Sequence, residues 1–205
     1  MAEAKAKAAV VESKSAVVAK AAAGVDTTKD LQPYSEGNVS PRAAKGLKAD
    51  VAARLLARAK RPLLVVGGRA QEPEMLRRAI AIGKAGLPIA ATGGSVKAFL
   101  DAKYNNNVYA INLNELTARL RDRAWTGFDG KGNYDVVAFF GHTHYYANQF
   151  LSTLKNFVPE VCTLCVDRFY CINADFSFGN LPEQEFYAAT DDLIANIKTA
   201  TKTKE

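Results

Sequence analysis

From Lys48 to Lys198, continuous apolar runs alternate with stretches in which apolar residues recur every three or four positions. The continuous runs predict strands buried on both faces, as in a parallel sheet. The periodic stretches predict helices with one buried face. The predicted strands are 61–68, 87–92, 134–141 and 160–167, and the predicted helices are 48–60, 72–86, 95–103, 113–125, 144–157 and 182–198.

Two of these helices have a clear apolar face. The predicted buried positions are Val51, Leu55, Leu56 and Ala59 in helix 48–60, and Phe186, Ala189, Leu193 and Ile197 in helix 182–198. Both patterns fit a helix that packs on a sheet with its polar side in water.

Strands that alternate with helices over some 150 residues predict an α/β protein with a three-layer, doubly wound parallel sheet, Rossmann-like in architecture. Ligand sites in such folds lie outside the carboxyl ends of the strands. The loops expected there are 67–69, 92–95, 141–144 and 167–169. The glycine-rich loop 127–135 enters a strand at its amino end and is interpreted as a turn.

The composition changes near residue 40. Residues 1–40 are rich in Ala and Lys and then in Pro, Gly, Asn and Ser, without large apolar anchors. We expect this basic extension to be disordered or ordered by a partner. Residues 41–199 are expected to form a single α/β domain, followed by a tail over 200–205.

Charge and composition narrow the function classes. Of the net charge of +6, residues 1–60 carry +5, from 11 Lys or Arg and 6 Asp or Glu. A basic arm on a nearly neutral body favours an acidic protein partner over nucleic acid. The chain has no apolar run long enough for a membrane span and no signal-peptide pattern, and three cysteines fit a reducing compartment. A cytoplasmic protein without a membrane contact is therefore expected.

The first strand ends at Gly67-Gly68, which raises the question of a phosphate-binding turn. A dinucleotide fingerprint needs three spaced glycines and a later acidic residue, and the carboxylates of Glu72 and Glu74 oppose a pyrophosphate. The interpretation favoured for this loop alone is a glycine bend after a buried strand.

The loop Thr92-Gly93-Gly94-Ser95 suits an anion better, because the helix after it meets no carboxylate before Asp101. The alternative is that Ser95 is only the N-cap of that helix. The loop Gly141-His142-Thr143 also opens a helix, with Thr143 available as a cap.

The histidines and cysteines offer no complete metal or redox site. His142 and His144 are interpreted as a polar pair in a loop, with acid–base chemistry left open. Cys162 and Cys165 lie three apart in a strand and are expected to point to opposite faces, and Cys171 cannot complete a four-cysteine cluster. We expect no complete catalytic site and no metal ligands in this chain.

Four segments resemble the epsilon subunits of archaeal carbon monoxide dehydrogenase/acetyl-CoA synthase complexes. They are "AKRPLLVVGG", "GLPIAATGGS", "WTGFDGKGNYDVVAFFGHTHYYANQFLSTLKNF" and "DRFYCINADFSFGNLPEQEF", and the likeness covers about residues 40–197. The first two are also similar to the central domain of thiamine-diphosphate enzymes. The Ala/Lys-rich arm, Cys171 and Gly179 depart from the pattern expected for the family.

The resemblance implies an accessory subunit in the one-carbon metabolism and methanogenesis of archaea. The expected partner is the catalytic alpha subunit in a two-plus-two heterotetramer within the larger acetyl-CoA complex, and the nickel–iron–sulfur and iron–sulfur clusters are expected in that partner. The alternative is an electron-transfer subunit that binds FAD. Its expected cofactor-binding residues are Gly67, Gly68, Thr92, Gly93, Gly94, Ser95, Gly141, His142 and Thr143, with Tyr145, Tyr146, Phe169 and Tyr170 as a stacking surface.

Overall fold

The computed structural model describes residues 24–33 and 42–202. They contain a seven-stranded sheet with the order β1-β7-β6-β5-β2-β3-β4, in which each strand pairing is parallel. The strands are β1 (Lys45–Gly46), β2 (Pro62–Val66), β3 (Ile89–Ala91), β4 (Val108–Ala110), β5 (Val136–Phe140), β6 (Cys162–Cys165) and β7 (Phe176–Ser177). The helices are α2 (Ala49–Arg58), the 3₁₀ helix η1 (Gly68–Gln71), α3 (Pro73–Lys84), α4 (Ser95–Asp101), α5 (Leu113–Arg121), α6 (His144–Phe157) and α7 (Glu183–Lys202).

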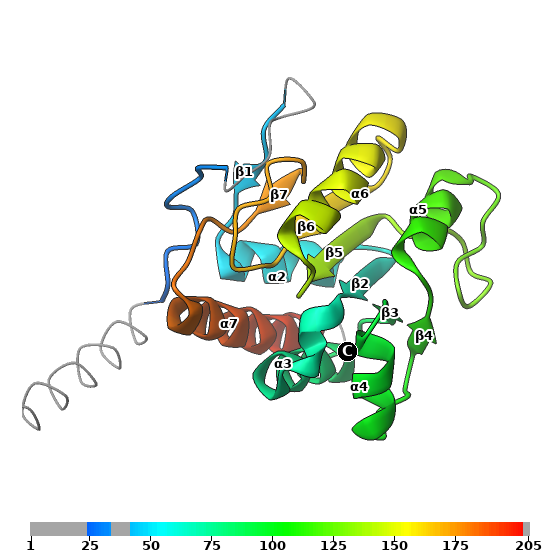
Figure 1. Ribbon diagram of the computed structural model, residues 1–205, viewed down its shortest axis with the longest axis horizontal. Coiled ribbons are helices and arrows are strands. Elements are labelled where there is room, and N and C mark those ends of the chain that lie inside the picture. The colour runs from blue at the N-terminus through cyan, green and yellow to red at the C-terminus, as the bar shows by residue number, and fades with distance from the viewer. Residues whose placement is uncertain (1–23, 34–41, 203–205) are drawn as a thin grey trace, which may run out of the picture.

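Helices cover both faces of this sheet (Figure 1). The side chains of strand β2 alternate between the two cores that these helices cover. Leu64 and Val66 belong to the core shared with α2, α3 and α7. Leu63 and Val65 belong to the core shared with α5 and α6. Successive side chains of a strand point to opposite faces, so an unbroken apolar run is what a doubly covered strand needs. The predicted three-layer, Rossmann-like fold is confirmed.

The four predicted strands are present, but the sequence missed β1, β4 and β7. These strands have two or three residues each and carry no long apolar run. The predicted face of α2 was partly wrong. Its buried residues are Ala49, Ala52, Ala53 and Leu56, while Val51, Leu55 and Ala59 are only partly buried. The small alanines allow a close approach to α7, which the larger side chains would prevent.

The last helix follows its prediction closely. Phe186, Ala189, Leu193 and Ile197 are all fully buried on one stripe of α7. No helix in the described part of the chain is long and apolar enough to cross a membrane.

Residues 24–33, which the sequence-based division assigned to the extension, pack on the domain. The Thr27 hydroxyl donates to the Leu47 carbonyl at 2.6 Å, and the Gly179 N–H donates to the Thr27 carbonyl at 2.8 Å. A Cβ atom at Gly179 would lie 1.8 Å from the Lys29 carbonyl oxygen, so glycine is required for this approach. The rest of the predicted extension, and residues 203–205 of the predicted tail, lie outside the described residues.

The chain changes direction between β2 and β5, which are neighbours in the sheet. From β2 it continues to β3 and β4 on one side, and from β5 to β6 and β7 on the other. The carboxyl ends of β2 and β5 therefore form the topological switch point, where open α/β sheets bind ligands. The loops that follow them begin at Gly67 and Gly141.

Candidate functional site

The two loops at the switch point are in direct backbone contact. The Gly67 N–H donates to the Phe140 carbonyl at 2.9 Å, and the Arg69 N–H donates to the Gly141 carbonyl at 3.0 Å. A Cβ atom at Gly67 would lie 2.4 Å from the Gly141 carbonyl oxygen and 2.6 Å from the His142 Cα atom. Gly67 therefore allows one loop to lie against the other. This close contact fits the interpretation of Gly67-Gly68 as a bend after a buried strand, and phosphate binding at this turn stays a prediction.

His142 fills the space beside this contact and is only 6% exposed. The Thr92 hydroxyl donates to the Val66 carbonyl at 2.9 Å, so its oxygen accepts from Nε2 of His142 at 3.3 Å. Nδ1 is then unprotonated, and it is buried without a hydrogen-bond partner among the described residues. Burial lowers the pKa of His142 from 6.5 to about 3, so the ring is neutral at physiological pH.

The loop 92–95 uses its polar groups internally. Ser95 is the first residue of α4 rather than its cap, and its hydroxyl lies 2.8 Å from the Thr92 carbonyl and 3.0 Å from the Val66 carbonyl. The Ser95 N–H donates to the Thr92 carbonyl at 3.2 Å. The Gln71 amide covers Gly94, where a Cβ atom would lie 2.2 Å from Nε2. The Ser95 hydroxyl and N–H therefore already have acceptors within the protein and are not free to bind a pyrophosphate. Phosphate binding by this loop stays a prediction.

A pocket of about 380 Å³ lies next to the switch point, over the ends of β5 and β6. It is lined by Arg69, His142, Thr143, His144, Ala147, Asp167, Arg168, Phe169 and Cys171. Of the predicted cofactor-binding residues, His142 and Thr143 line it, and Gly141 precedes them. Gly67, Gly68, Thr92, Gly93, Gly94 and Ser95 lie outside its lining. The predicted loops 67–69 and 167–169 contain the charged residues Arg69, Asp167 and Arg168, but the list of expected cofactor-binding residues left them out.

The charges of this pocket are largely matched. The Arg69 guanidinium binds Glu72 at 2.9 Å and lies 3.7 Å from Asp167 and 3.6 Å from Glu183. Burial raises the pKa of Asp167, whose carboxylate accepts hydrogen bonds from the His142 and Arg168 backbone N–H groups. Arg69 is therefore already committed to carboxylates and offers little attraction to a phosphate.

Arg168 is the pocket-lining cation for which the described residues provide no carboxylate partner. Its Nε donates to the Leu181 carbonyl at 3.2 Å, and its guanidinium lies 5.3 Å from the centre of the Phe169 ring. Such a stack holds a cation at the rim of a pocket at small entropic cost. Arg168 and Phe169 are thus the groups through which this pocket would contact a planar or anionic ligand.

The remaining candidate residues divide between the core of the domain and the exposed face of α6. Cys171 is buried, with its Sγ 3.8 Å from Nδ1 of His144. The Tyr170 hydroxyl donates to the Ala44 carbonyl at 2.6 Å, which removes this buried ring from the expected stacking surface. Tyr145 and Tyr146 are exposed on α6.

The two strand cysteines point to opposite faces of the sheet, as predicted. Cys162 packs with the α2, α3 and α7 side and Cys165 with the α5 and α6 side. Burial raises the pKa of Cys162 to about 11, which keeps it a thiol. Within residues 24–33 and 42–202, no group of three or more His, Cys, Asp or Glu is placed to hold a metal ion.

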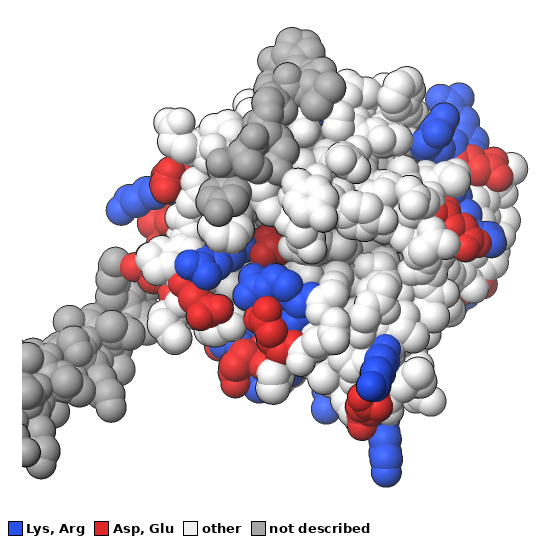
Figure 2. All heavy atoms as spheres, viewed as in Figure 1, with Lys and Arg blue, Asp and Glu red and all other residues white. Residues whose placement is uncertain are grey.

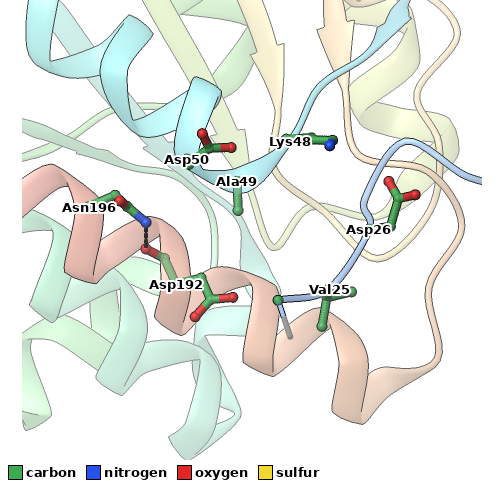
Figure 3. Close-up of a pocket in the computed structure, with 8 residues that line it drawn as sticks. Val25, Asp26, Lys48, Ala49, Asp50, Asp192 and Asn196 are labelled. Carbon is green, nitrogen blue, oxygen red and sulfur yellow. Dashed lines mark hydrogen bonds between the residues drawn. The ribbon is translucent and has the colours of Figure 1, made fainter. Parts of the chain in front are cut away.

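A second hollow, of about 370 Å³, lies where residues 24–26 meet α2 and α7. Its carboxylates, Asp26, Asp50 and Asp192, come from three segments and do not converge (Figure 3). The Asn196 amide donates to the Asp192 backbone carbonyl at 2.8 Å, while burial and the neighbouring Asp191 raise the pKa of Asp192. We assign no ligand to this hollow.

Comparison with known proteins identifies one group of relatives. Residues 28–194 match the family described as "CO dehydrogenase beta subunit/acetyl-CoA synthase epsilon subunit". The acetyl-CoA decarbonylase/synthase complex subunit epsilon of Methanothrix soehngenii is 45% identical over 179 residues, covering 85% of this chain and 96% of the relative. Subunit epsilon 1 of Methanosarcina barkeri is 44% identical over 175 residues, with 83% and 98% covered. The subunit epsilon of Methanothermobacter thermautotrophicus is 33% identical over 156 residues, with 76% and 89% covered.

Proposed function

Because this chain belongs to the CO dehydrogenase beta subunit/acetyl-CoA synthase epsilon subunit family, we propose that it is an accessory epsilon subunit that stabilises the catalytic alpha subunit of carbon monoxide dehydrogenase in an assembly of two alpha and two epsilon chains. The observation that carries the proposal is the filled switch point. Where this fold class usually binds its ligand, Gly67 lies against Gly141, and His142 is hydrogen-bonded to Thr92. A domain whose ligand crevice is closed by its own loops is suited to a structural role.

In this proposal the redox chemistry belongs to the partner. The nickel–iron–sulfur cluster and the electron-transfer clusters are placed in the alpha subunit, and carbon monoxide oxidation and acetyl-CoA cleavage or synthesis belong to the larger complex. The described part of this chain contributes a rigid sheet and its surfaces. The proposal also places the assembly in the cytoplasm.

The proposal is tested by producing the alpha subunit with and without this chain. We expect light scattering after size exclusion to give the mass of two alpha and two epsilon chains, and we expect carbon monoxide oxidation by the alpha subunit to survive heating longer in the assembly. An alpha subunit that elutes alone, and that loses activity at the same rate with or without this chain, would contradict the proposal.

A second candidate function is FAD binding at the pocket over β5 and β6, in support of electron transfer in the same complex. Its supporting observation is Arg168, held over Phe169 at the pocket rim without a carboxylate partner among the described residues. A volume of about 380 Å³ is enough for a ring system but small for a whole dinucleotide. When bound, a flavin would accept and pass on electrons, and this chain would bind and orient it.

The flavin candidate predicts saturable FAD binding that depends on Arg168. We expect Arg168→Ala to weaken binding about 10-fold or more in a calorimetric titration, with the alpha subunit present, because a charge-assisted contact is lost. Arg54→Ala, on the exposed face of α2, is the matched control and should bind as the wild type does. Ser95→Asp is unsuitable as a probe because it would bury a carboxylate against two carbonyl groups. Equal affinity in Arg168→Ala, or no saturation, would count against this candidate.

A further inference from the structure

Helix α6 exposes a continuous face without a charged side chain. The exposed or partly exposed residues on this face are Tyr145, Tyr146, Gln149, Ser152, Thr153, Asn156 and Phe157. The one Lys in the helix, Lys155, is turned inward and only 4% exposed, where its ammonium donates to the carbonyls of Arg42 and Ile172. Each of the other α-helices in the described part of the chain exposes at least one charged side chain.

This composition is unusual for a helix in contact with water. A surface helix normally places charged residues opposite its buried face. The cores of protein–protein interfaces are instead depleted in charge and enriched in tyrosine and phenylalanine. Tyr145 is 60% exposed and Phe157 is 68% exposed, so large rings stand in solvent at both ends of the helix. Figure 2 shows a largely white surface over α6, whereas charged side chains gather around η1 and α3 and near α5.

The seven residues form one ridge along the helix. Each of them lies three or four positions from another member of the set, which places them on the same side of the helix, and 14 residues extend about 21 Å. Two of the rings in this ridge pack against neighbouring side chains. Tyr146 packs edge-on against Phe150 with 4.9 Å between ring centres, and the Arg121 guanidinium lies 5.6 Å from the centre of the Phe157 ring. Preordered rings lose little entropy when a partner covers them.

The shape of this ridge indicates what covers it. Two copies of a convex helix that cross at one point bury far less than the roughly 1,200–2,000 Å² of a stable interface. A groove in a larger chain, in contrast, can enclose the whole ridge, as grooves do for amphipathic helices. We infer that the exposed face of α6 is the surface that docks into an uncharged groove of the alpha subunit. This inference rests on the proposed function and adds the location and chemistry of the contact.

The test introduces charge into the ridge with minimal change of shape. Gln149→Glu and Gln149→Lys place either charge at the middle of α6, and Tyr145→Ala removes an exposed ring near its start. We expect each variant to weaken the affinity for the purified alpha subunit about 10-fold or more in a binding titration, since a charge buried in an uncharged groove is unpaired. Leu100→Glu and Leu100→Ala are matched controls, because Leu100 is 67% exposed on α4, and they should stay within about 2-fold of the wild type.

The outcomes separate this inference from the function on which it rests. If the wild-type chain binds the alpha subunit and the Gln149 and Tyr145 variants bind equally well, the docking surface lies elsewhere while the proposed function stands. If the wild-type chain does not bind at all, both fail. If the isolated chain forms a dimer that Gln149→Glu dissociates, the ridge is an interface between two copies of this chain and the inference is overturned.

Discussion

Replacing Gly67 with alanine should lower the free energy of unfolding by about 3 kcal/mol, the upper end of the usual cost of overpacking. The added methyl group would lie 2.4 Å from the Gly141 carbonyl oxygen and 2.6 Å from the His142 Cα atom, and both are backbone atoms of the loop after β5. Backbone cannot rotate away as a side chain can, so β2 and β5 would have to separate at their carboxyl ends. Gly67 itself has an extended backbone with φ −93°, so the penalty comes from the close approach alone.

The adjacent glycine is the matched control for this prediction. A Cβ atom at Gly68 would meet nothing closer than Nε2 of Gln71 at 4.0 Å, so Gly68→Ala should change stability by less than about 0.5 kcal/mol. Denaturant unfolding of the two variants, followed by circular dichroism, measures the difference. Equal stability of Gly67→Ala and Gly68→Ala would show that the two loops are not packed as described.

The glycine pair also shows how far the sequence alone could reach. The apolar run at Leu63–Val66 identified β2, because a strand covered on both faces needs such a run. The reason for Gly67 could not be predicted, since the atoms it approaches lie some 75 residues later. The same holds for β1, a two-residue strand that exists only because it pairs with β7.

The candidate site also has features that the sequence could predict and features that it could not. Three of the four loops named by the strand-end rule, 67–69, 141–144 and 167–169, contribute residues to the pocket, because the rule depends only on the order of strands and helices. It could not predict that His142 would turn towards Thr92, or that Arg69 would be surrounded by carboxylates at positions 72, 167 and 183. Both arrangements depend on contacts between distant segments.

The α6 ridge could be recognised only in part from the sequence. The sequence "HYYANQFLSTLKNF" shows that the helix is poor in charge, but it also contains Lys155, which a helix pattern would normally assign to solvent. In the structure Lys155 instead points inward, and its ammonium donates to the Ile172 carbonyl. Burial of that one cation is what leaves the outer face uncharged.

Lowering the pH should destabilise the folded protein mainly through His142. In the unfolded chain this histidine has an ordinary pKa of 6.5, whereas burial lowers the folded-state pKa to about 3. Above pH 6.5 the ring is neutral in both states and has no effect. Between these values the unfolded chain binds a proton that the folded chain does not. The free energy of unfolding therefore decreases as the pH is lowered. The expected loss is about 2 kcal/mol between roughly pH 6.5 and 4.5, since each unit of pKa difference corresponds to about 1.4 kcal/mol.

Two carboxylates with shifted pKa values contribute to the pH dependence of stability in the opposite direction or only at lower pH. Burial raises the pKa of Asp167, so the folded protein takes up this proton first, and Asp167 partly offsets the loss near its own pKa. Hydrogen bonds from Arg61 lower the pKa of Asp129, whose contribution is lost only below about pH 4. Between pH 6.5 and 4.5, the change is therefore expected to follow His142.

Urea unfolding at a series of pH values measures this effect. His142→Gln keeps an amide that can donate to Thr92 but cannot titrate, so we expect lower stability at pH 7 and a nearly flat dependence between pH 6.5 and 4.5. Gly68→Ala, in the facing loop, removes no titratable group and should retain the wild-type slope. If His142→Gln keeps the full acid dependence, the buried neutral imidazole is not its source, and protonation of other groups must open the contact between the β2 and β5 loops.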